Sequence, residues 1–370
     1  MRATVAIVML IVGLVIGGLI GRFALAPARV DTSIETGGTP GEPAPAAAAP
    51  VRWKLASAYA HSTAVLGETV DHFIDSLGAM SQGDIELRFY EPGALIPALE
   101  VFDAVSSGSV ESGYSTPGFW AGKEPALQLF ASVPFGPSAP EYMAWYYMGG
   151  GQAMLDELYA KHDIKPLLCG LFPPEASGWF RNEITGPDDL KGLKMRFFAL
   201  GARVMEKLGV STQLLAGGDI FPALELGTID ATEYASPAID RNLGFYQVAK
   251  HYYFPGWHQQ STWVEIIVNL DKWNGLSESQ RSMFEVACGD MVRYSIALGE
   301  AAQVPAMEFL QQQGVVFHKW SPEMLGLFKS GWDQVLAEEV AKDPTFARVW
   351  ASLNDFRTRY ATWRDLGYLN

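Results

Sequence analysis

Charged side chains lie in segments of this chain that are otherwise apolar. Arg196 lies in the strand-like run Leu193–Phe198, and Glu233 lies near the end of a second strand-like run, Thr228–Tyr234. A charge without a partner in such surroundings is costly, so each of these side chains needs a partner. Arg196 and Glu233 could simply pair with each other. A carboxylate ligand that bridges the arginine and a metal ion would satisfy both charges at the same time.

Two turns add further groups that could bind a ligand. Glu175 lies in a proline-fixed turn, residues 173–178, and Gln259 lies in an amide-rich turn, residues 255–260. Glu175 is either exposed at the surface or directed into a site. Carboxylate, amide and backbone oxygens are hard ligands suited to sodium, calcium or magnesium. An arginine fork binds a carboxylate with two parallel hydrogen bonds. These residue types therefore suit the binding of an organic acid, with or without a metal ion.

Motifs of covalent or metal-dependent catalysis are missing from the sequence. It contains no G-x-S-x-G, H-E-x-x-H or C-x-x-C motif, and its six histidines are scattered without ligand spacing. An enzyme acting on organic acids, such as a metal-dependent lyase, would need an acid/base pair that the sequence does not present. We therefore expect a binding protein and not an enzyme.

The length and composition limit the number of domains, the possible partners and the state of the cysteines. The chain has 370 residues, enough for two domains, and its formal net charge of -14 argues against nucleic acid or an anionic membrane surface as partner. Its two cysteines, Cys169 and Cys288, lie far apart inside apolar runs, so we expect buried free thiols and no disulfide framework.

The N-terminus is predicted to direct export. One arginine precedes an apolar stretch, Ala3–Ile20, that is long for a cleaved signal and just sufficient for a spanning helix. We expect residues 1–25 to be either a signal peptide or an uncleaved signal anchor. Residues 26–50 are rich in proline and alanine and are predicted to be a flexible linker.

Two helix–glycine–strand units could position the charged side chains. Phe102–Ser112 and Phe221–Ala231 share the pattern F-x-A-apolar-x-x-G-[S/T]-[V/I]-[D/E]-small. Tyr114 lies at the same offset from the first unit as Glu233 does from the second. The similarity is either chance or the mark of two related α/β lobes whose strand ends face one another. Because ligands bind at the carboxyl ends of strands in open α/β sheets, Tyr114, Glu233 and Tyr234 would then line one cleft.

The remaining pattern predicts further elements. Ser277–Gln280 is a capping box that opens a long helix, with a kink expected at Pro305. Asp219 is a predicted N-cap of a short helix, and Ala235–Leu243 is expected to be a loop. The tail Pro322–Tyr368 is amphipathic and helical, with aromatic residues that we expect to pack on the body or against another subunit.

Taken together, several motifs resemble those of the extracytoplasmic solute-binding proteins of TRAP transporters, in the branch that binds 2-oxo and 2-hydroxy monocarboxylates. The resemblance covers roughly residues 51–360. The motifs that carry it are YEPGALI (Tyr90–Ile96), GYSTPGFWAGK (Gly113–Lys123), GWFRN (Gly178–Asn182), DDLKGLKMR (Asp188–Arg196), GTIDATEY (Gly227–Tyr234) and YYFPGW (Tyr252–Trp257).

The resemblance implies a two-lobed α/β fold like that of periplasmic binding proteins, with a cleft between the lobes, crossing strands and a long spanning helix. The implied parts are lobe I (51–172, with part of about 246–270), lobe II (173–245, with part of about 262–320), the spanning helix (277–313) and the C-terminal helical tail (321–370).

The resemblance also implies roles for individual residues. Arg196 would bind the substrate carboxylate, and a sodium or calcium ion would bridge the ligand to the protein. Two glutamates and the charge of the substrate would favour a divalent ion. Tyr114, Phe197 and Tyr234 are the implied walls of the substrate site, together with Glu175. The implied metal ligands are Glu175, Glu233, Gln259 and the backbone of Tyr234.

The function implied by the resemblance is transport. The protein would capture a small organic acid such as pyruvate or lactate in the periplasm and deliver it to the TRAP membrane permease. A tether to the inner membrane through an uncleaved N-terminal segment and a homodimer through the C-terminal helices are further expectations. The alternatives are a sensory ligand-binding protein and a metal-dependent enzyme acting on the same class of acids.

Overall fold

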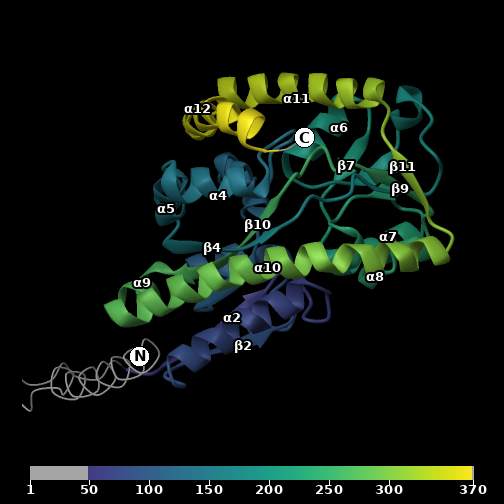
Figure 1. Cartoon of the computed structure of the whole chain (residues 1–370). Coiled ribbons are helices and arrows are strands. Elements are labelled where there is room, and N and C mark those ends of the chain that lie inside the picture. The colour runs from purple at the N-terminus through teal and green to yellow at the C-terminus, as the bar shows by residue number, and fades with distance from the viewer. Residues whose placement is uncertain (1–48, 369–370) are drawn as a thin grey trace, which may run out of the picture. The chain divides into compact units, whose positions relative to one another are not determined.

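The computed structural model describes residues 49–368, which form an α/β structure with two sheets (Figure 1). The expected signal or anchor segment, residues 1–25, lies outside the described residues, as does the expected linker apart from its last two residues. In the part of the chain that the structure describes, no helix is both long enough and apolar enough to cross a membrane.

Each of the two lobes is built around one sheet, which confirms the two-lobed α/β fold expected from the sequence. The first sheet has the strand order β2-β1-β3-β10-β4, and the second has the order β11-β9-β5-β8-β6-β7. The strands of the first sheet are β1 (Val51–Ser57), β2 (Ile85–Tyr90), β3 (Ser112–Ser115), β4 (Ile164–Phe172) and β10 (Thr262–Asn269). The strands of the second sheet are β5 (Gly178–Phe180), β6 (Lys194–Arg196), β7 (Ser211–Gln213), β8 (Ala231–Thr232), β9 (His251–Phe254) and β11 (Val316–Lys319).

The two helix–glycine–strand units lie one in each lobe. α3 (Val101–Ser106) leads through Gly108 to β3, which runs parallel to β1. α7 (Gly217–Glu225) leads through Gly227 to β8, which runs parallel to β6. Both glycines have a positive φ, 74° and 71°, which glycine adopts without the steric cost of a Cβ atom. The two units therefore have the same construction in the two lobes.

Two short crossings connect the sheets and lie side by side, and a third passage leads from β10 through the long helix to β11. Residues 173–177 connect β4 to β5, and residues 255–261 connect β9 to β10. The backbones of the two crossings are joined by hydrogen bonds from Glu175 N to Gln259 O (3.1 Å) and from Gly256 N to Glu175 O (3.0 Å). Both predicted turns with ligand-binding side chains are therefore parts of one junction between the lobes.

The long helix α10 (Glu278–Gln312) packs against both lobes. Its N-terminus carries the predicted capping box, because Ser277 Oγ accepts from Gln280 N and Gln280 Oε1 accepts from Ser277 N. The helix packs on β4 and α2 (Leu66–Met80) of the first lobe and on α8 (Pro237–Leu243) of the second. Figure 1 shows it running from one lobe to the other. Its 35 residues correspond to a length of about 50 Å at the helical rise of about 1.5 Å per residue. Pro305 lies inside it.

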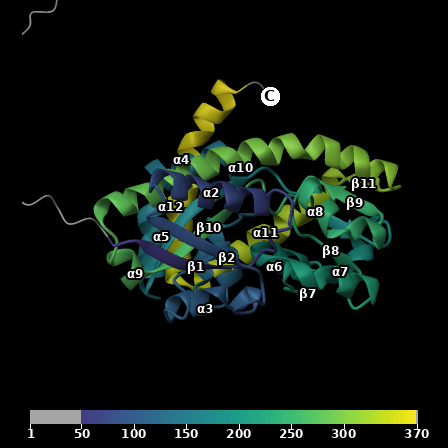
Figure 2. The same cartoon turned by 90° about the horizontal axis from the view of Figure 1, so that it is seen from below.

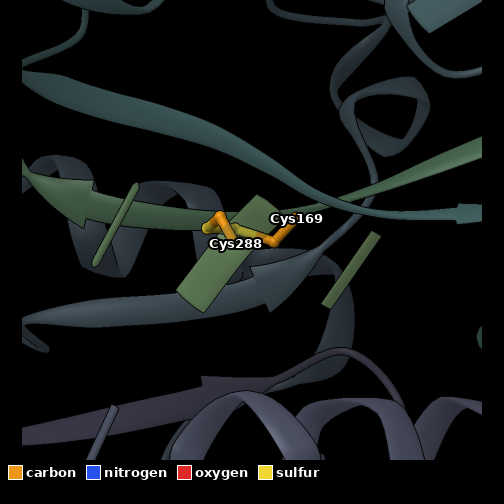
Figure 3. Close-up of a disulfide and its surroundings, with 2 residues drawn as sticks. All are labelled: Cys169 and Cys288. Carbon is orange, nitrogen blue, oxygen red and sulfur yellow. A yellow bond between two sulfur atoms is a disulfide. The ribbon is translucent and has the colours of Figure 1, made fainter. Parts of the chain in front are cut away.

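A disulfide joins Cys169 of β4 to Cys288 of α10 (Figure 3). The prediction of two buried free thiols is therefore wrong. The two residues are 119 positions apart, and only the packing of α10 on β4 brings them together. Disulfides persist in oxidising compartments such as the periplasm, so this bond agrees with export of the chain.

Two further predictions, both in the second lobe, are corrected. The N-cap of α7 is Ala216, and Asp219 lies in the first turn of this helix. The carboxylate of Asp219 is favoured there by the positive end of the helix dipole, so an acid at this point does not by itself identify the cap. Residues 235–243, expected to be a loop, contain α8, which begins at Pro237. Proline suits the first position of a helix because its fixed φ matches the helical value.

The C-terminal tail is helical, as expected, and it packs on both lobes. α11 (Pro322–Lys342) packs on α6 (Ala199–Lys207), whereas α12 (Pro344–Gly367) packs on α4 (Ala139–Met148) and α5 (Gly151–Ala160). The last turns of α12 project from the body (Figure 2), with Trp363 59% exposed and Leu366 83% exposed. The other helices within residues 49–368 are α9 (Leu270–Asn274) and the 3-10 helices η1 (Ala98–Glu100), η2 (Pro117–Trp120), η3 (Pro125–Phe130), η4 (Pro187–Leu190) and η5 (Phe245–Gln247).

Candidate functional site

A small cavity lies where the two lobes meet the two crossings. Its volume is about 50 Å³ when measured from the positions open to the centre of a water-sized sphere. A single water needs about 10–15 Å³ by this measure, so the cavity suits a ligand of only a few non-hydrogen atoms. The lining residues are Tyr59, Leu66, Thr116, Phe119, Phe172, Thr262 and Val264 from the first lobe, Arg196, Phe198, Tyr234, Ala235, Ser236 and Ile239 from the second, and Pro173, Glu175 and Gln259 from the crossings.

Arg196 is the only basic residue in the cavity wall, and it is 2% exposed. Its Nε donates to the carbonyl oxygen of Leu215 (3.3 Å), and its Nη1 donates to the carbonyl oxygen of Glu233 (2.7 Å). Nη1 also lies 3.0 Å from Glu233 Oε2, so the arginine and the glutamate do form the ion pair that the sequence left open. Nη2 has no hydrogen bond within residues 49–368, which leaves one arm of the fork for a ligand.

The strand geometry explains how the second lobe presents this pair. β6 runs parallel to β8, and Arg196 lies opposite Thr232 in this pairing. The hydrogen bond from Glu233 N to Arg196 O (3.2 Å) extends the ladder by one residue beyond β8. The guanidinium carbon of Arg196 lies 5.1 Å from the centre of the Tyr234 ring, a cation–π distance. The ends of two neighbouring strands therefore place one cation, one anion and one aromatic ring together.

Glu175 is held at the junction by contacts to the second crossing and to β10. Its Oε1 accepts from Gln259 Nε2 (3.0 Å) and from Thr262 Oγ1 (2.7 Å). The residue is 6% exposed, so the surface alternative for Glu175 does not apply. Gly256 packs directly against the carbonyl of Glu175, and a Cβ atom at this glycine would collide with that backbone. The turn can therefore approach Glu175 this closely only because residue 256 lacks a side chain.

Several buried polar atoms around Glu175 have no hydrogen bond among the described residues. They are Glu175 Oε2, both carboxylate oxygens of Glu233, Gln259 Oε1 and both ring nitrogens of His258. Of these, Glu233 Oε2 has the charge of Arg196 Nη1 at 3.0 Å but no hydrogen bond to it. Acceptor atoms of Glu175, Glu233 and His258 all lie within 4.8 Å of one another. Buried polar groups in folded proteins are nearly always satisfied, so this cluster requires a partner with positive charge or hydrogen-bond donors. A cation fits this donor set of carboxylate, amide and imidazole groups.

Burial shifts the titration of these groups. It raises the pKa of Glu175 to about 8, against the lowering effects of the Thr262 hydrogen bond and the Arg196 charge. Burial also raises the pKa of Glu233, although Arg196 and His258 act in the opposite direction. The same burial lowers the pKa of His258 to about 4. Each shift favours the uncharged form, because burial removes the water that would solvate the charge.

The structure brings together five of the seven predicted site residues. Arg196, Glu175, Tyr234 and Gln259 line the cavity, and Glu233 lies directly behind Arg196. Two of the predicted wall residues, Tyr114 and Phe197, do not line it. Tyr114 is fully buried below Tyr59 and donates to the carbonyl oxygen of Leu66 (3.2 Å). Phe197 packs against Trp257 and His258, outside the cavity wall. The adjacent Phe198 lines the cavity instead.

Sequence reasoning missed the apolar part of the cavity wall and the residues that support it. Tyr59 lies just after the carboxyl end of β1. This position could have predicted that Tyr59 lines the cavity. Asp240, in the helix that was expected to be a loop, accepts from Ala235 N (3.1 Å), Trp179 Nε1 (2.9 Å) and Tyr252 Oη (2.7 Å). These bonds fix the backbone directly after Tyr234. The pKa of Asp240 is raised to about 7 by burial.

A two-lobed α/β fold with a small ligand cavity at the lobe junction defines the class of bilobed solute-binding proteins. A comparison with known protein families supports this class. Residues 56–343 match bacterial extracellular solute-binding protein family 7 (DctP). The chain belongs to this family, which consists of transporter solute-binding proteins and not of enzymes. The alternative of a metal-dependent enzyme is thereby set aside.

Three known proteins are similar to most of this chain. The chain is 34% identical over 322 residues to the monocarboxylate 2-oxoacid-binding periplasmic protein of Nostoc sp. (strain PCC 7120), covering 86% of this chain and 88% of that protein. It is similar to a TRAP transporter solute-binding protein from Bordetella bronchiseptica RB50, a mixed-occupancy dimer with calcium and picolinate in one active site (TM-score 0.83, 34% identity, 85% and 94% of the two chains). It is also similar to a TRAP periplasmic solute-binding protein from Pseudoalteromonas atlantica with bound sodium and pyruvate (TM-score 0.82, 29% identity, 85% and 96% covered).

Proposed function

We propose that this protein captures a small 2-oxo or 2-hydroxy monocarboxylate of the pyruvate or lactate type and delivers it to a TRAP membrane permease. The observation that carries the proposal is the cluster of unsatisfied buried acceptors beside the buried Arg196. Such a cluster is costly in the empty protein and is satisfied when a cation and a carboxylate bind together. Relatives that bind pyruvate together with sodium, or a 2-oxoacid, support this pairing.

In this proposal the ligand carboxylate binds the free arm of Arg196. Glu175, Glu233, Gln259 and the backbone oxygen of Tyr234 hold a sodium or calcium ion, which supplies positive charge to the 2-oxo or 2-hydroxy oxygen and to the carboxylate. Two acidic ligands favour calcium over sodium, because affinity rises with the charge of the ligand set. These groups come from the second lobe and both crossings, whereas the first lobe contributes apolar wall residues such as Leu66 and Phe172. A ligand held in this cavity would therefore contact both lobes and stabilise their closed arrangement.

The rest of the cavity suits a short apolar side chain. Leu66, Phe119 and Phe172 of the first lobe face Phe198 and Ile239 of the second across a space of about 50 Å³. A second carboxylate in this space would lose its hydration without gaining a cation, since Arg196 is the only basic residue in the lining. We therefore expect the cavity to bind monocarboxylates more tightly than dicarboxylates.

Equilibrium dialysis of the purified protein with radiolabelled pyruvate, in the presence of calcium, tests this ligand class. We expect retention of one pyruvate per chain, displacement by lactate and short 2-oxo acids, and no displacement by malonate. Failure to retain pyruvate, or displacement by malonate as strong as by lactate, would overturn the assignment. Deleting the gene should abolish uptake of the same acid by cells. Unchanged uptake together with a lost response to the acid would instead indicate a sensor.

We also propose a homodimer formed through the exposed end of α12, where Trp363 and Leu366 would pack against a second copy. The relative from Bordetella bronchiseptica is a dimer, which supports self-association. Light scattering with Trp363→Glu and Leu366→Glu should show monomers. The matched change Val304→Glu, at an equally exposed residue of α10 (64%), should leave the mass unchanged. A monomeric unmodified protein would contradict the proposal.

The family acts outside the cytoplasm, and we propose a periplasmic location for this chain. Whether residues 1–25 are removed or retained as a tether is decided by the mass of the protein isolated from cells. A mass that includes this segment, together with recovery in the membrane fraction, would support the tether.

A further inference from the structure

His258 is a buried histidine whose ring has no partner. The residue is 1% exposed, and neither Nδ1 nor Nε2 has a hydrogen-bond partner among the described residues. Four other histidines behave differently. His61 and His72 contact Asp71 and Asp290, and the rings of His251 and His318 contact each other. Because buried imidazole nitrogens in folded proteins are nearly always satisfied, the ring of His258 requires a partner that the protein does not supply.

The surroundings of the ring hold it in place without using its nitrogens. It packs edge-on against Phe197 (4.9 Å between ring centres, 71° between planes) and against Trp257 (5.6 Å, 71°). Gly201 provides the space on this side, because a Cβ atom there would lie 3.0 Å from His258 Cβ. Nε2 lies 3.7 Å from Glu175 Oε2, too far for a hydrogen bond. The ring is therefore fixed by apolar contacts and placed beside the unsatisfied carboxylates.

The separations among these groups match those of ligands around a single ion. Atoms of Glu175, Glu233 and His258 all lie within 4.8 Å of one another. Two ligands bonded to one ion at about 2.1–2.6 Å can lie up to roughly 4–5 Å apart. One ion can therefore contact both carboxylates and the imidazole without rearrangement of the backbone.

We propose that His258 supplies a nitrogen ligand to the bound cation, which makes the site selective for divalent ions that accept imidazole, such as Mn²⁺ or Co²⁺, over sodium. The inference rests on the proposed function and adds a ligand to its oxygen-only set. Sodium and calcium prefer oxygen, whereas first-row divalent metals gain affinity from imidazole in the order Mn²⁺ below Co²⁺. The nitrogen thus changes which ions the site takes and leaves the carboxylate contact to Arg196 unchanged.

Electron spin echo spectroscopy of the Mn²⁺-loaded full-length protein, with pyruvate present, tests the proposal. The method detects a nitrogen nucleus bonded to the metal, and that is a readout of ligation and not of transport. We expect a nitrogen coupling in the unmodified protein and its loss in His258→Gln. The control His318→Gln removes one ring of the touching pair His251 and His318, away from the proposed ion site, and should keep the coupling.

Titration of the same variants with Co²⁺ and Ca²⁺ adds a second measurement. His258→Gln should lose about tenfold or more in Co²⁺ affinity and much less in Ca²⁺ affinity. Pyruvate-dependent Mn²⁺ binding without nitrogen coupling in the unmodified protein would overturn the role of His258 and leave the proposed function intact. Absence of both pyruvate and cation binding would instead refute the proposed function. Because the decisive spectrum comes from the unmodified protein, the test does not depend on the folding of a variant.

Discussion

Replacing Arg196 by lysine tests whether the free arm of this side chain binds the ligand. Arg196→Ala would leave Glu233, which is fully buried, without its counter-charge and would cost about 3–5 kcal/mol in stability, so weak binding could reflect unfolding. A lysine keeps the positive charge beside Glu233 Oε2. It cannot also present a second arm to the ligand, because a lysine ammonium lacks the planar fork of the guanidinium.

The expected loss follows from the hydrogen bonds that remain. The ammonium can replace the contacts of Nη1 to Glu233. It cannot replace the bond that we propose from Nη2 to the ligand carboxylate. One hydrogen bond to a charged group contributes about 1.5–3 kcal/mol, so pyruvate affinity should fall about 10- to 150-fold. Stability should change little.

Calorimetric titration with pyruvate at saturating calcium measures this loss, with thermal unfolding as the check on folding. Arg203→Lys is the matched control, because Arg203 also forms an ion pair, with Glu339 (2.9 Å), but lies outside the cavity. The control should bind pyruvate like the unmodified protein. A folded Arg196→Lys variant whose affinity stays within about twofold of the unmodified protein would refute the assignment of this side chain.

Three further predictions concern the metal, the disulfide and a second buried acid. Glu233→Gln should weaken calcium binding about tenfold or more, since it removes one charged ligand, and an unchanged calcium titration would exclude Glu233 from the ion site. Reducing the Cys169–Cys288 bond should lower the free energy of unfolding in urea by about 2–5 kcal/mol, and equal midpoints with and without reductant would contradict this. Burial raises the pKa of Glu265 to about 7 from 4.5, so the folded state binds more protons, and the stability relative to Glu265→Gln should fall by about 3 kcal/mol as pH rises across that interval. Parallel stability curves for the two proteins would refute the shift.

The polar residues of the site could be predicted from the sequence because they are charged residues within apolar segments. Arg196 and Glu233 are charges inside apolar strand-like runs, and the requirement that each has a partner made their pairing one of two alternatives. The capping box at Ser277 identified the long helix for a similar reason, since its signal is local. Local conflicts and local caps can be found without knowledge of the fold.

The features that the sequence did not show depend on packing between distant segments. Cys169 and Cys288 are brought together only by the contact of α10 with β4. His258 lies close to Glu175, which belongs to the other crossing. The spacing of the histidines along the sequence therefore could not predict its role. The exchange of Phe197 for Phe198 has a different cause. Phe197 and Phe198 directly follow β6, and Phe198 is extended. Neighbouring side chains in extended backbone point to opposite sides, so a one-residue uncertainty reverses which ring faces the cavity.

The claim that a cation and a carboxylate bind as a pair is tested most directly by calorimetry of the metal-stripped protein. Pyruvate is titrated first without any added cation, and then with calcium or with sodium. We expect one-to-one binding that requires a cation and is tighter with calcium than with sodium. Equal affinity with and without cations would remove the metal from the site, and the absence of pyruvate binding in all three buffers would contradict the account as a whole.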